Sequence, residues 1–169
     1  RYDSRSADRG TPPGTPRGSG AGFVHLHVHS SYSLLEGALT IARLAELAKA
    51  DHQPAFALTD TDNMFGALEF SEKLAAYGIQ PIVGCALAVD FGDSDHGPRN
   101  GNVVPERTRV ILLAARPEGY RSLMRLNSRA FLETPPNEQP HLKLAWLEDE
   151  TEGLIALTGG PGGPLDVAI

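Results

Sequence analysis

The sequence predicts an α/β fold in which parallel strands alternate with helices, in a truncated barrel or sheet. Strand-like and helix-like segments follow each other along the chain, which is typical of parallel strands joined by helices. Residues 110–115 form an uninterrupted apolar run, as expected for a strand covered on both faces. The chain contains only about five strand-like segments, whereas a standard (β/α) barrel has eight strands.

The first of these segments are a strand, a helix and a second strand. Residues 23–29 alternate histidines with apolar or β-branched residues, which favours a strand. Residues 39–50 carry apolar side chains at helical spacing, and Thr40 is a suitable N-cap. The short apolar run 55–59 predicts a buried strand. The helix is expected to bury Ile41, Leu44, Ala45 and Ala48.

A second helix and a third strand come next. Residues 63–77 predict the helix, and Gly78 fits the position just after its end. Residues 82–89 predict the strand, and the polar, glycine-containing stretch 91–107 predicts a surface loop. The helix is expected to bury Ala67, Phe70, Leu74 and Tyr77.

The remaining elements are the apolar strand 110–115, a third helix and a final strand. Pro117 suits the first turn of the helix. Residues 154–158 predict the strand, and a glycine-rich turn follows it. The helix is expected to bury Tyr120, Leu123, Met124, Ala130 and Phe131.

Residues 1–22 differ in composition from the rest of the chain. They are rich in Gly, Pro, Ser and Arg and contain too little apolar surface to offset chain entropy. We therefore expect a disordered leader over 1–22; the alternatives are a cloning remnant or a start codon placed too far upstream.

Composition restricts the environment and the partners of the chain. No apolar run approaches the ~20 residues of a membrane-spanning helix, and the first residues lack the apolar core of a signal peptide. The single Cys85 excludes an internal disulfide, so a cytoplasmic location is expected. The net charge of the whole chain is −6. Residues 1–22 contain four arginines and two aspartates, so the rest of the chain is more negatively charged than the chain as a whole. This acidic part of the chain is not expected to bind DNA by itself.

The candidate chemistry begins at three histidines in the first predicted strand. His25, His27 and His29 are each two residues apart, so a regular strand would place them on one face. Neutral imidazoles on one face are suitable ligands for zinc, manganese or iron. The alternative is a strand that happens to carry histidines, and the regular spacing favours the functional interpretation.

Acidic residues nearby could complete a metal site. Glu36 follows the histidines, and Asp60 and Asp62 follow a predicted strand, at the end where α/β barrels place their active sites. The two aspartates could equally serve turn and N-cap chemistry, and Glu36 could belong to a turn.

Several spaced segments resemble one known family. They are 23–37, 57–66, 78–84, 112–115 and 153–159. Together they resemble the polymerase and histidinol phosphatase (PHP) domain that begins the alpha subunits of bacterial DNA polymerase III. The resemblance implies a distorted seven-stranded (β/α) barrel, so 23–169 is interpreted as an incomplete PHP domain of this barrel type.

The resemblance also implies a metal site of which only part is present. The family's His-x-His pair corresponds to His27 and His29, and its acidic residue to Glu36, where aspartate is more usual. The other ligands expected in the family fall at Thr61, Ala86, Arg109 and Gly160. We therefore interpret the site as vestigial, with His25, Asp60 and Asp62 as accessory candidates. Arg109 is hypothesised to substitute a fixed positive charge for the metal, paired with Glu36 or a neighbouring aspartate.

The functions implied by the resemblance belong mainly to a longer chain. The full chain would be a Mg²⁺-dependent, DNA-templated DNA polymerase that binds DNA through other domains. No catalytic residue is expected in this stretch, which would be a structural and interaction module. No cofactor of its own is expected, although bound residual zinc or manganese is left open. Its partners would be other polymerase III subunits, especially the epsilon proofreading exonuclease, with no membrane involved. The alternative is an active metal-dependent phosphoesterase or proofreading nuclease, which the missing ligands disfavour.

Overall fold

A computed structural model describes residues 22–92, 107–160 and 163–167. The strands are β1 (Ala55–Leu58), β2 (Gln80–Asp90), β3 (Arg109–Ala114), β4 (Leu142–Lys143) and β5 (Leu154–Leu157). The helices are α1 (Ile41–Ala50), α2 (Ala67–Ala76), α3 (Pro117–Glu133), α4 (Leu144–Asp149) and α5 (Pro164–Val167). The expected leader, apart from residue 22, and most of the expected loop 91–107 lie outside the described residues. The sequence did not predict β4, α4 or α5.

The sheet is mixed rather than wholly parallel. Its order is β1-β2-β3-β5, and β4 pairs with the end of β2. β1 and β4 run parallel to β2, but β2–β3 and β3–β5 are antiparallel pairs. The expectation of parallel strands is therefore wrong for β3, which runs opposite to the other strands; β5, antiparallel to β3, has the same direction as β1 and β2. A strand that is parallel to the preceding one needs a long crossover, usually a helix, whereas an antiparallel strand can follow a loop. Because a polar stretch rather than a helix separates β2 from β3 in the sequence, β3 pairs antiparallel with β2.

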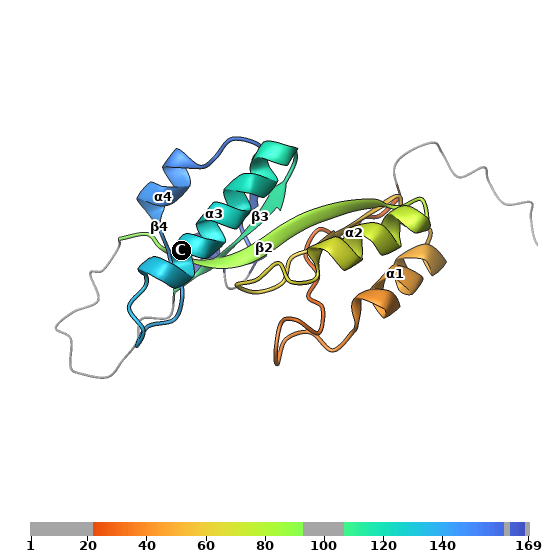
Figure 1. The fold of residues 1–169 in the computed structure, drawn as a ribbon, viewed down its shortest axis with the longest axis horizontal. Coiled ribbons are helices and arrows are strands. Elements are labelled where there is room, and N and C mark those ends of the chain that lie inside the picture. The colour runs from red at the N-terminus through yellow and green to blue at the C-terminus, as the bar shows by residue number, and fades with distance from the viewer. Residues whose placement is uncertain (1–21, 93–106, 161–162, 168–169) are drawn as a thin grey trace, which may run out of the picture.

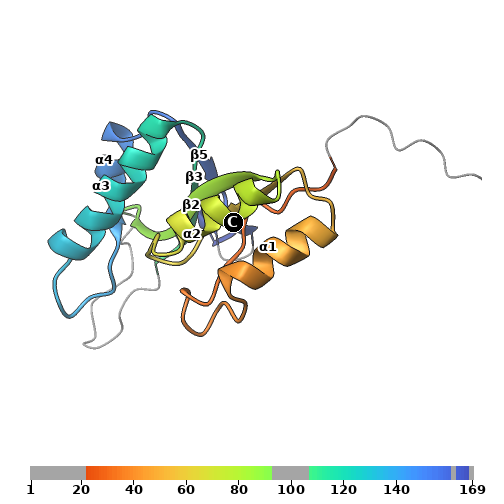
Figure 2. The same cartoon turned by 45° about the vertical axis from the view of Figure 1, so that its right-hand side comes forward.

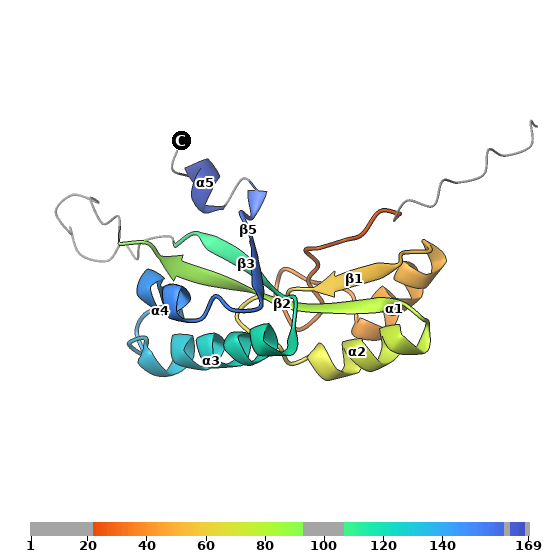
Figure 3. The ribbon, with the colours of Figure 1, turned by 90° about the horizontal axis from the view of Figure 1, so that it is seen from above.

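Helices α1 to α4 lie on one side of the sheet (Figure 3). Helices α1 and α2 form one core with β1, and α3 and α4 form another with β2, β3 and β4. Strand β2 runs through both halves of the molecule, as Figures 1 and 2 show. The described strands form an α/β fold whose sheet does not close into a barrel.

The first two helices follow local signals in the sequence. The Thr40 hydroxyl accepts a hydrogen bond from the Arg43 backbone N–H at 3.4 Å, and α1 buries the predicted face. Helix α2 begins at residue 67 rather than 63, because the Asn63 side chain forms a turn by accepting from the Phe65 N–H at 3.2 Å. It buries the predicted face except for Tyr77, which is exposed.

Helix α3 begins at Pro117 as predicted but buries a different stripe. Leu123 and Ala130 are buried, whereas Met124 and Phe131 are exposed and Tyr120 is half-buried. The buried stripe also contains Gly119, Ser122 and Leu126. At the start of the helix this stripe needs a glycine because the backbones meet closely: a Cβ atom at Gly119 would lie 2.0 Å from the carbonyl oxygen of Gly153.

Candidate functional site

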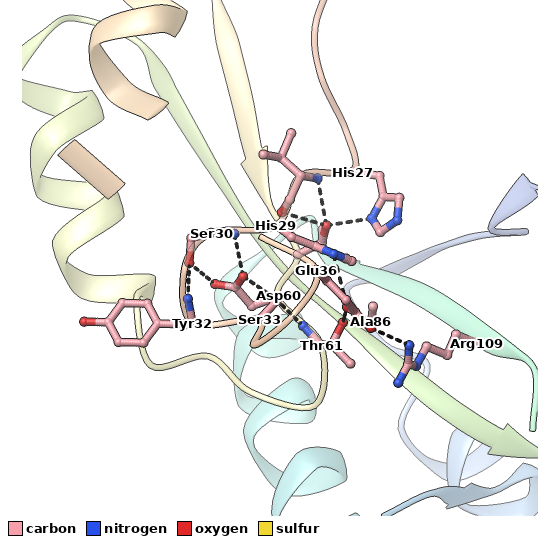
Figure 4. A network of polar contacts seen from close by, with 12 residues as sticks. His27, His29, Ser30, Tyr32, Ser33, Glu36, Asp60, Thr61, Ala86 and Arg109 are labelled. Atoms are coloured by element: carbon pink, nitrogen blue, oxygen red, sulfur yellow. Dashed lines mark hydrogen bonds and ion pairs between the residues drawn. The ribbon is translucent and has the colours of Figure 1, made fainter. Parts of the chain in front are cut away.

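A polar cavity of about 350 Å³ contains several of the candidate residues. Its lining combines basic, acidic and imidazole side chains from distant parts of the chain. The lining residues are His27, His29, Glu36, Ala86, Arg107, Arg109, Ile111, Gln139 and Gly159. Figure 4 shows most of its polar groups converging beside β2, with Arg109 reaching in from the first residue of β3.

The structure brings two of the three histidines together. The rings of His27 and His29 lie 4.8 Å apart, whereas the His25 ring packs against Phe56 at 5.7 Å and does not line the cavity. The cause is an irregular first segment, which is extended but is not the regular strand that the sequence predicted.

The irregularity is visible in the backbone hydrogen bonds. The N–H groups of Ala57 and Thr59, two residues apart, donate to the carbonyls of His25 and Val28, three residues apart, each at 2.9 Å. One extra residue on the first segment acts as a bulge and reverses the alternation of side chains. His25 consequently faces another environment than His27 and His29.

Thr59 holds this bulged segment and orients His27. Its buried hydroxyl accepts from the Val28 N–H at 3.0 Å and donates to the Val28 carbonyl at 3.2 Å. The same hydroxyl lies 2.8 Å from His27 Nδ1 and is hydrogen-bonded to it, with the imidazole as donor or acceptor according to its tautomer. Burial, followed by the neighbouring His29, lowers the pKa of His27. Sequence reasoning missed Thr59 as a site residue because its contacts span about thirty positions.

Glu36 is the centre of the polar contacts in the cavity. Its carboxylate accepts from Arg109 Nη1 at 2.9 Å and from the Thr61 hydroxyl, and its Oε2 lies 3.2 Å from His29 Nδ1. The Thr61 hydroxyl, then Arg109 and His29, lower the pKa of Glu36 against the opposing effect of burial. Each charged partner is partly exposed, so the Arg109–Glu36 pair alone contributes at most about 1 kcal/mol.

Asp60 lies outside the cavity and anchors the loop that carries Glu36. It is buried, and its carboxylate accepts from the backbone N–H and hydroxyl of Ser30, both at 2.7 Å, and from the Ser33 hydroxyl at 2.6 Å. Its contacts are therefore structural. The two serines, which lie six and three residues before Glu36, were not singled out from the sequence.

Asp62 borders the same region in a strained conformation. Its φ is 55°, in the left-handed region, and its Oδ1 atom is buried without a partner among the described residues. Burial raises the pKa of the Asp62 carboxyl, while Arg109 and Gln139 act in the opposite direction. Asp62 is thus a partly buried carboxyl whose ionisation costs stability.

We expect the Asp62→Asn variant to gain free energy of unfolding, relative to the unmodified chain, as the pH rises. A carboxyl whose folded-state pKa is raised takes up a proton on folding, so stability falls as pH rises above the unfolded value of about 4. Asparagine does not titrate and tolerates the left-handed conformation. Urea unfolding between about pH 3 and pH 6.5 would show a relative gain that grows with pH. Asp149→Asn, at an exposed position, is the control; an equal gain there, or a difference independent of pH, would contradict the argument.

Comparison with known proteins places these residues in a family. The model of the PHP domain matches residues 25–169. The chain belongs to the PHP domain family. Among curated relatives, it is 40% identical over 150 residues to the DNA polymerase III subunit alpha of Caulobacter vibrioides and 43% identical over 144 residues to that of Treponema pallidum. These alignments cover 87% and 85% of this chain but only 12% of either relative, so the chain spans about an eighth of their length.

A solved structure of an amidohydrolase from Chromobacterium violaceum is also similar in part. It is 25% identical, with a TM-score of 0.48, and the match covers 63% of this chain and 32% of that one. Among the residues that the structure describes, no helix has both the length and the apolar character needed to span a membrane.

The PHP domain implies a metal site, and the donor set of this chain does not fit it. Thr61 and Ala86, at two expected ligand positions, form an isolated parallel bridge, and the Thr61 hydroxyl is bonded to Glu36. Arg109 offers a cation and Gly160 no side chain. Within 22–92, 107–160 and 163–167, no three His, Cys, Asp or Glu side chains are placed to hold a metal ion. A catalytic metal needs about three protein ligands. His27 and His29 could supply two, but the Glu36 carboxylate already accepts hydrogen bonds from Thr61 and Arg109, so the set is insufficient here.

Proposed function

We propose that this chain is the PHP portion of the alpha subunit of a bacterial DNA polymerase III, where it acts as a structural and interaction module. Template-directed DNA synthesis, its Mg²⁺ ions and the principal DNA contacts belong to other parts of the full chain. The similarity to two such subunits supports the proposal. It implies a cytoplasmic location and partners among the polymerase III subunits, first of all the epsilon proofreading exonuclease.

The observation that carries the structural role is the Arg109–Glu36 ion pair. Arg109 stands where the resemblance places a metal ligand, and its guanidinium lies 2.9 Å from Glu36. A guanidinium is permanently charged and has fixed donor directions, so it neutralises the carboxylate without a metal ion. We propose that Arg109 takes over the electrostatic role of the metal, joining β3 to the loop that carries Glu36.

The alternative function is metal-dependent phosphoester hydrolysis. Two observations favour it: the adjacent rings of His27 and His29, and the His29 Nε2 atom, which is buried without a partner among the described residues. These atoms could supply two ligands. The positions of Thr61, Ala86 and Arg109 supply none, which ranks this function second.

Assays on the purified full-length protein would separate the two functions. We expect Mg²⁺-dependent primer extension that His27→Ala leaves unchanged, and less than one equivalent of bound zinc or manganese by elemental analysis. His52→Ala, an exposed histidine outside the cavity, is the control. Stoichiometric metal together with Mn²⁺-dependent phosphatase activity that His27→Ala abolishes would establish the alternative. Absence of primer extension by the unmodified full-length protein would contradict the main proposal.

A further inference from the structure

A groove of about 480 Å³ lies between helices α2 and α3, on the side of the sheet that the helices cover (Figure 3). Pro81 and Val83 of β2 and Ala114 of β3 contribute to its floor. Leu68, in the first turn of α2, and Tyr120, in the first turn of α3, contribute to its walls. The groove shares no lining residue with the polar cavity described above. We call it the α2–α3 groove.

The floor of the α2–α3 groove continues the buried core surface of the sheet. Residues two apart in a strand point to the same face, so Val83 lies on the face of β2 that carries Cys85 and Leu87. Those two side chains are fully buried in one core with Leu123 of α3, whereas Val83 is only half-buried. Leu68 beside it is 72% exposed. The groove therefore presents apolar surface where the layer of described helices is interrupted, and such surface is typical of a binding site.

The character of the lining favours a helix as the occupant. A bound segment brings backbone N–H and C=O groups, which need hydrogen-bond partners once they leave water. The lining is mostly apolar, and the Ser71 hydroxyl already donates to the Ala67 carbonyl of its own helix at 2.7 Å. A helix pairs its backbone groups internally and can insert apolar side chains spaced at i, i+3, i+4 and i+7.

The charge of the groove favours an acidic side chain on that helix. Arg116 lines the groove, is exposed, and has no ion-pair or hydrogen-bond partner for its guanidinium within the part of the chain that the structure describes. The positive ends of both helix dipoles also lie at the groove. The acidic residues of the two first turns, Glu69 and Glu118, pair within their own helices with Lys73 and Arg121. A carboxylate from outside could therefore pair with Arg116.

We infer that the α2–α3 groove binds an amphipathic helix of a separate protein, with apolar side chains against Val83 and Leu68 and an aspartate or glutamate against Arg116. The inference rests on the proposed function, in which this chain is an interaction module among the polymerase III subunits. Nucleic acid and anionic lipid surfaces are bound through several cations, and a mostly apolar groove with one arginine does not match them.

Binding of a synthetic helix to the full-length protein tests this inference. The probe is a fluorescein-labelled amphipathic peptide with leucines at i, i+3, i+4 and i+7 and glutamates beside them; a matched peptide carries lysine in place of each glutamate. We expect fluorescence anisotropy to show that the glutamate peptide binds about tenfold more tightly, because an opposite charge at Arg116 replaces a like charge. Arg116→Glu should reverse this preference, and Leu68→Ser should weaken binding of both peptides.

The control is Arg43→Glu, which reverses an exposed charge on α1 outside the groove and should leave the preference unchanged. Failure of the glutamate peptide to bind, which would also result if another part of the full chain filled the groove, would overturn the inference. A preference that survives Arg116→Glu would overturn it as well. Primer extension by the same preparation is scored separately. If it is present without the expected binding, the inference alone fails; if the unmodified protein lacks it, the proposed function fails whatever the peptides do.

Discussion

Replacing Asp60 by alanine is expected to lower the free energy of unfolding by about 3 kcal/mol. The carboxylate accepts three hydrogen bonds from Ser30 and Ser33, and all three residues are buried. Alanine would leave these donors without an acceptor in a place that water does not reach, and each hydrogen bond to a charged group is worth roughly 1.5–3 kcal/mol. The loss is smaller than their sum because the buried charge also disappears.

Asp60→Asn provides the matched comparison. Its amide oxygen can still accept from the Ser30 N–H and the Ser33 hydroxyl, while its NH₂ group faces a Ser30 hydroxyl that can turn to accept. We therefore expect a loss between that of Asp60→Ala and zero. Urea unfolding followed by circular dichroism measures both variants. Equal losses, or an Asp60→Ala variant as stable as the unmodified chain, would show that the network does not hold the loop.

The sequence predicted those elements whose signals are local. Helix α1 buries the expected face because its apolar spacing and the Thr40 cap lie within a dozen residues. The direction of β3 was missed because it depends on how the strands pair, which periodicity does not encode. The exposed Phe131 shows the same limit, since the neighbours of α3 select its buried stripe.

The site divides in the same way between local and distant signals. Spacing and family resemblance pointed to His27, His29 and Glu36, all within ten residues of one another. They could not show the bulge that turns His25 away, because it arises where the first segment pairs with β1. Thr59 is likewise defined by a partner 32 positions away in the sequence.

Replacing Gly37 by alanine should destabilise the chain by about 3 kcal/mol and release Glu36 from Arg109. A Cβ atom at position 37 would lie 1.9 Å from the carbonyl oxygen of Ser30 and 2.5 Å from its carbonyl carbon. Both atoms belong to the backbone, so no side chain can move aside. The loop must open, and Glu36 is the adjacent residue. Hydrogen exchange of residues 30–40 should therefore increase together with the loss of stability.

Gly78→Ala separates this clash from the general cost of replacing glycine. Gly78 has a φ of 71°, but an added Cβ atom would meet nothing within 4 Å, so only the left-handed conformation costs energy, about 1 kcal/mol. Its effect should leave hydrogen exchange in 30–40 unchanged. If Gly37→Ala costs no more than Gly78→Ala, or leaves exchange in the loop unaltered, close packing against Ser30 is not what holds Glu36 beside Arg109. If both effects appear, Gly37 is the residue that lets the loop close tightly enough for an arginine to pair with Glu36.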